Sequence, residues 1–370
     1  MASDTPAATL RSRLPWTTAV PVLALVVLAI SWGRYPPTVV AVLIGVVLIG
    51  AVLAAVHHAE VVAHRVGEPY GSLVLAVAVT VIEVALIVTL MVSGGDDTAS
   101  LARDTVFAAV MITCNGIVGL SLLLGALRHG IVSFNAEGTG AALATVTTLA
   151  VLSLVLPTFT EAESGPQFSS SQLAFAAVAS LVLYGAFVLT QTVRHRDFFL
   201  PVAHDGGVLA EDEHADPPTS RAALTSLGLL VAALVAVVGL AKVVSPSIED
   251  AVAAAGAPQS FVGVVIALLV LSPETLAAAK GARRNRLQNS LNLAFGSAMA
   301  SIGLTIPVIA LAMIWLEGPL ILGLEPTQMV LLGVTIVVAV LTVVPGRATR
   351  LQGVVHLALL ASFVFLAVNP

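Results

Sequence analysis

Eleven apolar stretches, each about long enough to cross a bilayer, constrain the fold of this 370-residue chain more than any other feature. A bilayer core of about 30 Å needs roughly 20 apolar residues of helix, and only a backbone that satisfies its own hydrogen bonds survives there. The sequence therefore predicts an all-α polytopic membrane protein of about 11 transmembrane helices. The stretches cover residues 16–33, 36–56, 70–93, 104–126, 139–157, 171–193, 222–244, 258–279, 287–316, 327–344 and 351–369.

The composition indicates a lipid environment and argues against nucleic acid as a partner. Hydrophobic residues make up 58% of the chain and charged residues only 10%, so a soluble fold could not bury them all. A net charge of −5 with 5% aromatic residues gives no basic surface for nucleic acid. The single cysteine, Cys114, lies in an apolar stretch and is expected to pack there.

The distribution of Lys and Arg predicts the orientation in the membrane. Cytoplasmic loops carry an excess of these residues. With the N-terminus inside, all sixteen basic residues except Arg34, Arg103 and Lys242 are cytoplasmic. The first stretch lacks a small-x-small cleavage pattern at its end, so we expect a retained helix rather than a signal peptide. The prediction is a multi-pass protein of the cell (inner) membrane, with an extracytoplasmic C-terminus.

The longest hydrophilic segment divides the chain into two halves. It is rich in acidic residues and histidine, and we interpret it as a solvated cytoplasmic linker, with cation collection or sensing as the alternative. After the lead stretch 16–33, five stretches precede the segment and five follow it. Because five is odd, the second set of five enters the membrane from the opposite side, as an inverted repeat. The predicted parts are a tail and lead helix (1–35), a first five-helix repeat (36–193), the linker (194–221) and a second five-helix repeat (222–370).

Two of the twenty-one acidic residues, Glu83 and Glu274, lie in the middle of apolar stretches. Each follows an aromatic residue, Tyr70 or Phe261, by thirteen positions, which is about 20 Å of helix and reaches the bilayer middle. A charged carboxylate at that depth costs at least about 2.5 kcal/mol, so it must be neutralised. Burial favours the protonated acid and a bound cation favours the ionised acid, so proton and cation compete for the same oxygens.

Neutral oxygen ligands are available close to both glutamates. Thr80 lies one turn before Glu83, and Ser272 and Pro273 immediately precede Glu274. A proline inside a helix frees a carbonyl about four residues earlier, and the carbonyl expected here is that of Val270. Oxygen ligands favour Ca²⁺, Na⁺ or Mg²⁺ over soft metals. The predicted cation ligands are Glu83, Glu274, Asn115, Ser297, Thr80, Ser272 and Asn292, with Thr113 and Ser301 as weaker candidates.

Four segments resemble bacterial calcium/proton antiporters of the ChaA type, which belong to the cation/calcium exchanger superfamily. They are residues 67–72 (GEPYGS), 80–87 (TVIEVALI), 271–274 (LSPE) and 292–297 (NLAFGS). The resemblance covers essentially the whole chain and implies one lead helix and two inverted five-helix repeats. It implies that one glutamate of each repeat, here Glu83 and Glu274, alternately takes Ca²⁺ or protons.

The resemblance also assigns supporting residues and shows departures. Ser297 resembles the serine or threonine of the partner helix in the second repeat, Asn115 takes the equivalent place in the first, and residues 211–216 resemble the family's acidic stretch. The superfamily often has Gly-Asn three to four residues before the glutamate, where this chain has Val79-Thr80 and Val270-Leu271. A histidine often follows the second glutamate, where this chain has Thr275. These departures leave the choice between Ca²⁺ and Na⁺ open.

The resulting hypothesis is a secondary active antiporter that exports Ca²⁺ in exchange for protons. A broader form of the hypothesis includes Na⁺ as a second exported cation. A monovalent Na⁺ or K⁺/proton antiporter is the alternative. The expected partners are the lipid bilayer and the transported cations. No enzyme activity or cofactor is expected, because the sequence has neither a nucleotide-binding loop nor the H-E-x-x-H motif of a hydrolase. A channel is a third possibility, but paired acids in inverted, broken helices fit alternating access better.

Overall fold

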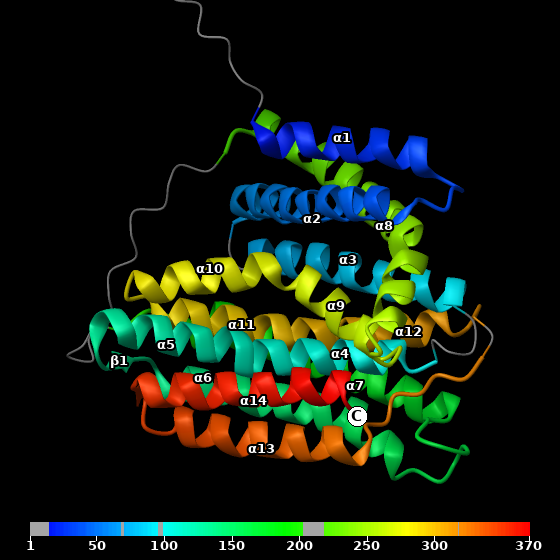
Figure 1. Ribbon diagram of the computed structural model, residues 1–370. Coiled ribbons are helices and arrows are strands. Elements are labelled where there is room, and N and C mark those ends of the chain that lie inside the picture. The colour runs from blue at the N-terminus through cyan, green and yellow to red at the C-terminus, as the bar shows by residue number, and fades with distance from the viewer. Residues whose placement is uncertain (1–14, 68–69, 95–98, 203–217, 317) are drawn as a thin grey trace, which may run out of the picture.

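The computed structural model describes residues 15–67, 70–94, 99–202, 218–316 and 318–370, with the side chains of 70–73 and 93–94 excepted. Most helices lie side by side in one stack (Figure 1). In the first half they are α1 (Trp16–Ser31), α2 (Thr38–Val66), α3 (Tyr70–Gly94), α4 (Leu101–Met111), α5 (Val118–His129), α6 (Ala136–Ala150) and α7 (Ser170–Leu189).

Short segments of π- or 3₁₀-helix extend or join several of these helices. A π-helix joins α4 to α5, so that residues 101–129 form one rod, and similar segments extend α6 and α7. They are η2 (Ile112–Ile117), η3 (Val151–Val155), η4 (Leu156–Thr158), η5 (Thr190–Arg194) and η6 (Arg196–Phe199).

The second half repeats this order of helices after the linker. Its helices are α8 (Ser220–Ala254), α9 (Phe261–Val270), α10 (Ser272–Arg283), α11 (Leu287–Gly303), α12 (Thr305–Ala312), α13 (Pro326–Val343) and α14 (Arg350–Val368). A two-stranded antiparallel sheet, β1 (Val132–Ser133) with β2 (Arg347–Ala348), connects the two halves.

The predicted class of helical membrane protein is confirmed. Within the described residues, nine helices are long and apolar enough to cross a membrane, and the bent pair α9–α10 gives a tenth span. The shorter α1 corresponds to the first predicted stretch. Several helices extend beyond their apolar stretch: α2 continues to Val66 and α8 to Ala254. Hydropathy therefore located the part of each helix suited to lipid and missed its polar ends.

The predicted linker is only in part a solvated segment. Its first residues form η6, where Phe199 is buried and its backbone carbonyl accepts a hydrogen bond from Asn292 on α11. Its last residues, Ser220 and Arg221, begin α8. The acidic residues 205–216, to which the cation-sensing alternative refers, lie outside the described residues.

The lead helix and the first helix of each repeat form one side of the molecule. α2 and α8 pack along one another and α1 packs against both, at the top of Figure 1. The remaining helices of the two repeats interleave below them, and α3 and α9 lie at the boundary. The proposed site lies among these interleaved helices.

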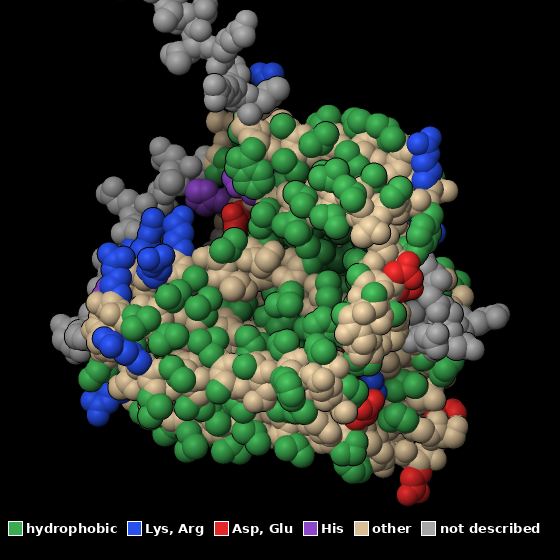
Figure 2. Space-filling model, in the orientation of Figure 1, with side chains coloured by type: hydrophobic (Ala, Val, Ile, Leu, Met, Phe, Trp, Pro, Cys, Tyr) green, Lys and Arg blue, Asp and Glu red, His purple; other side chains and the backbone are tan. Residues whose placement is uncertain are grey.

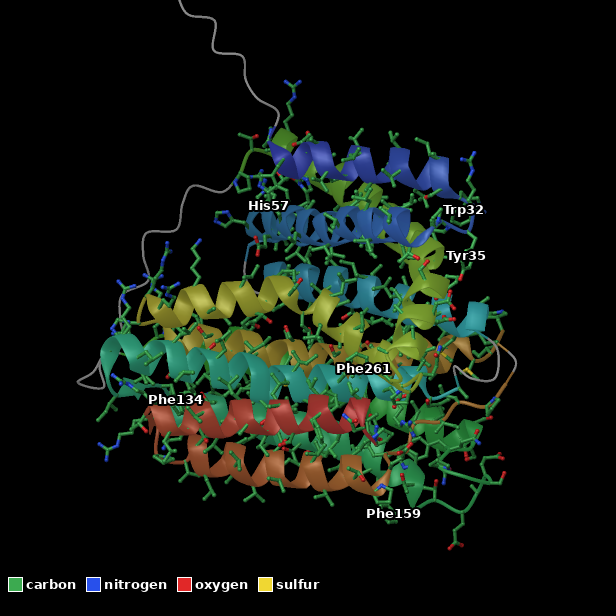
Figure 3. The ribbon with its side chains drawn as sticks, in the orientation of Figure 1. Trp32, Tyr35, His57, Phe134, Phe159 and Phe261 are labelled. Atoms are coloured by element: carbon green, nitrogen blue, oxygen red, sulfur yellow. The ribbon has the colours of Figure 1, made fainter. Side chains whose placement is uncertain are left out.

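Basic side chains gather at one end of the helix stack, at the left of Figure 2. Figure 3 shows His57 and Phe134 towards this end and Trp32, Tyr35 and Phe159 at the other. We call the first the basic end and the other the opposite end. The orientation predicted from the loops makes the basic end cytoplasmic, and this assignment remains a prediction. Basic residues from chain segments that reach this end include Arg65, Arg128, Arg194, Lys280, Arg283, Arg286 and Arg350.

Candidate cation-binding site

A cavity of about 310 Å³ lies among α3, α7, α10 and α11, and both predicted glutamates line it. Two of its lining residues, Gln191 and Asn289, are each three positions from an arginine of the basic end, Arg194 and Arg286. Glu83 lies halfway along α3. The cavity, which we call the inner cavity, therefore runs from the basic end to the middle of the helix stack.

Glu83 reaches the inner cavity from the middle of α3 and is only 3% exposed. Its Oε2 accepts a hydrogen bond of 2.8 Å from the Ser301 hydroxyl on α11. Its Oε1 is buried and has no hydrogen-bond partner in the described part of the chain. A buried carboxylate oxygen without a partner is costly, so it requires a proton or a cation.

Glu274 is held at a break between two helices. α9 ends at Val270, α10 begins at Ser272, and the two helix axes differ by 53°. Glu274 is the third residue of α10, where the exposed N–H groups and the helix dipole favour negative charge. It is 6% exposed, and its Oε2 has no partner among the described residues. The site thus holds a second carboxylate oxygen able to accept a proton or a cation.

The carbonyl released by Pro273 differs from the predicted one. Proline has no N–H to donate to the carbonyl four residues back, which is that of Leu269 rather than Val270. The Ser272 hydroxyl donates to this Leu269 carbonyl at 2.8 Å. Ser272, a predicted ligand, therefore bonds to the helix backbone and is not among the residues that line the inner cavity.

Three of the other predicted ligands line the inner cavity with the glutamates: Thr80, Asn292 and Ser297. Asn292 is already engaged, because its Nδ2 donates to the Phe199 carbonyl at 2.6 Å and its Oδ1 accepts from Gln288 at 2.8 Å. We therefore expect Thr80 and Ser297 to be the more available oxygens.

Asn115 belongs to a different polar cluster and does not line the inner cavity. It lies in η2, its Nδ2 donates to Thr335 Oγ1 at 2.9 Å, and its Oδ1 lies 3.1 Å from His356 Nδ1. Because an amide oxygen only accepts, His356 carries its proton on Nδ1. Its Nε2 then accepts a hydrogen bond from the Thr342 hydroxyl, whose Oγ1 lies 3.1 Å from Nε2. Its position in the sequence predicted that Asn115 is buried, but it could not predict the direction in which the side chain points.

The polar face of α11 contributes more residues to the site than predicted. Ser301, a weaker candidate in the sequence, donates to Glu83, and Asn289, which was not among the predicted ligands, lines the inner cavity. Asn289, Asn292, Ser297 and Ser301 recur at spacings of three, five and four residues, so they lie along one side of the helix. This spacing was the available signal.

The arrangement of donors suits a hard cation. Two carboxylates and several neutral oxygens face one cavity, and the described residues contain no group of three or more His, Cys, Asp or Glu that could hold a metal ion. Ca²⁺ and Na⁺ accept such oxygen ligands, whereas softer metals prefer thiolate or imidazole. Chemically, the site can hold a cation on ionised carboxylates or release it when they are protonated.

Comparison with known proteins agrees with this chemistry. A family model described as sodium/calcium exchanger protein matches residues 36–193 and 225–369. The chain is 47% identical over 362 residues to y4hA of Sinorhizobium fredii, which is named as an ionic transporter, with 96% of each chain covered. It is 37% identical over 350 residues to the sodium-potassium/proton antiporter ChaA of Escherichia coli, with 93% of each covered.

Solved structures of cation exchangers share the fold. YfkE, named as a Ca²⁺/H⁺ antiporter, superposes with a TM-score of 0.70 at 17% identity and covers 96% of this chain and 99% of its own. The H⁺/Ca²⁺ exchanger CAX superposes with a TM-score of 0.66 at 16% identity, over 95% of this chain and 91% of its own. The predicted superfamily and its inverted-repeat membrane fold are confirmed.

Proposed function

Because the chain belongs to the sodium/calcium exchanger protein family, we propose that it is a cation/proton antiporter that exports Ca²⁺, and Na⁺ as well, in exchange for protons. One observation carries the proposal. Glu83 and Glu274, one from each repeat, line the same buried cavity, and each has a carboxylate oxygen without a hydrogen-bond partner in the described structure. The two carboxylates are the shared site for the cation and the protons.

Competition for these oxygens couples the two fluxes. A divalent cation is neutralised by two carboxylates, and two protons neutralise the same pair when the cation leaves. Either loaded form places no net charge in the membrane interior, whereas the empty ionised pair places two negative charges there. The empty site is therefore disfavoured at the stage where the cavity changes sides, and exchange is favoured over leak.

The neutral oxygens around the glutamates would complete the coordination of the cation. Thr80 and Ser297 line the inner cavity, and Ser301 holds Glu83 through one oxygen while the other remains free. Ca²⁺ takes six to eight oxygens in flexible geometry, so water in the inner cavity would supply the remainder. No nucleotide hydrolysis is required, because the proton gradient drives the cycle.

A monovalent cation/proton antiporter is the second candidate. It is favoured by the 37% identity to ChaA, which is named as a sodium-potassium/proton antiporter. Two carboxylates also bind a monovalent ion when one of them stays protonated. The two candidates share the site and differ in the protonation of the pair while the cation is bound.

Transport in inside-out vesicles tests the proposal. With an acidic lumen, the wild-type protein should accumulate Ca²⁺, and parallel assays with Na⁺ and K⁺ identify the substrate. Glu83→Gln and Glu274→Gln should abolish accumulation, while Glu137→Gln, an exposed residue in the first turn of α6, should not. Correctly inserted Glu83→Gln protein that accumulates cation at the wild-type rate would refute the mechanism.

A further inference from the structure

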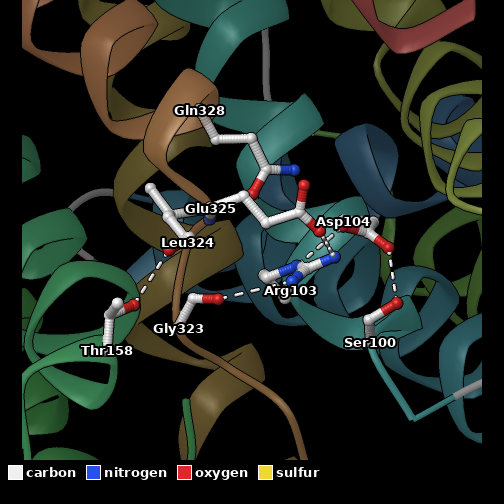
Figure 4. A network of polar contacts seen from close by, with 8 residues as sticks. All are labelled: Ser100, Arg103, Asp104, Thr158, Gly323, Leu324, Glu325 and Gln328. Carbon is white, nitrogen blue, oxygen red and sulfur yellow. Dashed lines mark hydrogen bonds and ion pairs between the residues drawn. The ribbon is translucent and has the colours of Figure 1, made fainter. Parts of the chain in front are cut away.

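A second pocket of about 150 Å³ lies at the opposite end of the molecule from the mouth of the inner cavity. We call it the outer pocket. α4, α9, α13 and α14 line it, and its charged residues are Arg103, Asp104 and Glu325. Figure 4 shows them together: Arg103 Nε lies 2.8 Å from Asp104 Oδ1, and an Arg103 terminal nitrogen lies 3.3 Å from Glu325 Oε1.

The inverted repeat allows the two cavities to be compared residue by residue. The sequence Val118-Gly119-Leu120-Ser121 of α5 matches Ile302-Gly303-Leu304-Thr305 at the α11–α12 boundary. A Cβ added at Gly119 would lie 2.9 Å from His356 Cβ on α14, and one added at Gly303 would lie 2.8 Å from Tyr184 Cβ on α7. The crossing of α5 with α14 is therefore equivalent to the crossing of α11 with α7, and His356 is the repeat counterpart of Tyr184.

This pairing sets the register between α7 and α14. Tyr184 and Gln191, seven residues apart on the α7 rod, both line the inner cavity. Seven residues after His356 comes Phe363, which lines the outer pocket. Gln191, near the mouth of the inner cavity, thus has Phe363 as its counterpart in the other repeat. The outer pocket therefore lies where the inverted repeat would place a second mouth, at the opposite end of the molecule.

The partner helices agree with this register. Counted along the sequence from the two glycines, Asn289 of the inner cavity corresponds to Thr105 on α4. The same count pairs Ser297 with Thr113 rather than with Asn115. Thr105 is fully buried, and its hydroxyl has no hydrogen-bond partner in the described structure. An unsatisfied hydroxyl at this depth is explained if the surface of α4 becomes hydrated in another state of the protein.

Aromatic packing separates the outer pocket from the middle of the molecule. Phe107 and Phe363, 1% and 5% exposed, pack edge to face with ring centroids 5.5 Å apart. Deeper along α14, a Cβ added at Gly116 would lie 3.2 Å from Leu360 Cδ2. In the other repeat, Ala300 is the counterpart of Gly116 and Val188 is the counterpart of Leu360, and both line the inner cavity. The same wall is thus open towards the basic end and packed shut towards the opposite end.

We infer that the outer pocket is the vestibule of a second ion pathway, which leads to Glu274 and Glu83 when the Phe107–Phe363 contact opens. This inference rests on the proposed exchange of cations and protons. Its ligand class is a hydrated cation: Asp104 and Glu325 carry two negative charges and Arg103 one positive charge, so these three side chains together carry one net negative charge. A small net charge attracts cations without holding them, which suits a point of entry and release.

Thiol accessibility tests the pathway without reference to any particular ion. The native Cys114 is first replaced by alanine, and a single cysteine is introduced as Leu360→Cys, or as Val188→Cys for the matched position on the inner wall. A membrane-impermeant thiol reagent is applied from each face of oriented vesicles. Leu360→Cys should react from the face that carries the outer pocket, and Val188→Cys from the face that carries the basic end.

The aromatic contact is tested by adding Phe363→Ala to the Leu360→Cys protein. Removal of the ring should raise the labelling rate from the outer-pocket face at least about fivefold and leave the rate at Val188→Cys unchanged. If the Phe363→Ala protein fails to insert, Phe107→Leu loosens the same contact with a smaller loss of volume. Labelling of Leu360→Cys only from the basic-end face, or no labelling from the outer-pocket face in either loosened variant, would overturn the inference.

The same vesicles separate this inference from the proposed function. Wild-type transport by Glu83→Gln protein would refute the shared carboxylate site but leave the labelling pattern as evidence for the pathway. Loss of transport in Glu83→Gln together with labelling of Leu360→Cys from the wrong face would keep the carboxylate site and refute the pathway.

Discussion

The two buried glutamates face the same cavity, yet the protein holds them in different ways. Glu83 lies within the continuous helix α3 and accepts a hydrogen bond from Ser301 of the other repeat. Glu274 lies in the first turn of α10, directly after the break from α9. A neutral hydroxyl from the other repeat therefore orients one carboxylate, and a helix terminus stabilises the charge of the other. The inverted repeat places one buried carboxylate in each half, but the groups that hold the two carboxylates differ.

This difference indicates a division of roles. The Ser301 hydroxyl fixes the position of Glu83, while the dipole of α10 favours the ionised form of Glu274. In the proposed mechanism, however, either the cation or the protons must neutralise both carboxylates. Variants that remove either charge should therefore have equal effects, whereas variants that alter the supports should separate the two glutamates.

Removal of either charge should have the largest effect. Glu83→Gln and Glu274→Gln keep the size and hydrogen bonding of the side chain but remove the titratable group. Each should lower cation-driven proton flux by at least about 100-fold, beyond the 10–100-fold typical of lost outer partners of a metal site. Proteoliposome flux with normalised protein content checks this. A large loss in only one variant would show that the two carboxylates are not equivalent.

Acidification should weaken cation binding on both glutamates. Protons compete with the cation, so the apparent affinity should rise with pH until both carboxylates are ionised, by up to about tenfold per pH unit for each competing proton. Initial uptake rates at several pH values check this. An affinity that stays constant between pH 6 and pH 9 in the wild-type protein would contradict shared binding.

Loss of the Ser301 hydroxyl should affect Glu83 alone. Ser301→Ala removes one hydrogen bond to a carboxylate, worth about 1.5 kcal/mol or more, so cation affinity should fall at least about tenfold with little change in maximal rate. Ser301→Thr keeps a hydroxyl at this position and should retain most of the wild-type affinity. An equal loss in Ser301→Thr and Ser301→Ala would mean that the hydroxyl is not what supports Glu83.

Ser272→Ala should have the smallest effect and serves as the control for Ser301→Ala. The Ser272 hydroxyl donates to the Leu269 carbonyl and does not line the inner cavity. We expect less than about a twofold change in affinity, because a carbonyl next to the helix break can accept from water instead. A change as large as that of Ser301→Ala would restore Ser272 as a cation ligand.

Much of the fold followed from the sequence because the bilayer imposes a simple physical rule. Apolar stretches of sufficient length predicted the helices in their order, and the lone acids inside them predicted the pair that lines the inner cavity. What hydropathy could not provide was rotation about the helix axis. Asn115 is as buried as expected, but its side chain bonds with Thr335 and His356.

The remaining misses concern backbone detail. The π-helical segment η2 changes which side chains face the cavity and has no unambiguous residue signature, whereas the break before Ser272 lies where Pro273 predicts a kink. The docking of Phe199 beneath Asn292 depends on a contact between distant parts of the chain, which no local pattern predicts. The polar spacing along α11, by contrast, is visible in the sequence and predicts the face of this helix that lines the inner cavity.

Proton release on cation binding tests the central claim most directly. Purified protein in a weakly buffered solution near neutral pH is titrated with Ca²⁺, and in parallel with Na⁺, while the pH is recorded. The wild-type protein should release protons in proportion to bound cation, and the Glu83→Gln, Glu274→Gln double variant should release none. Cation binding without proton release in the wild type, or unchanged release in the double variant, would contradict a site shared by cation and proton.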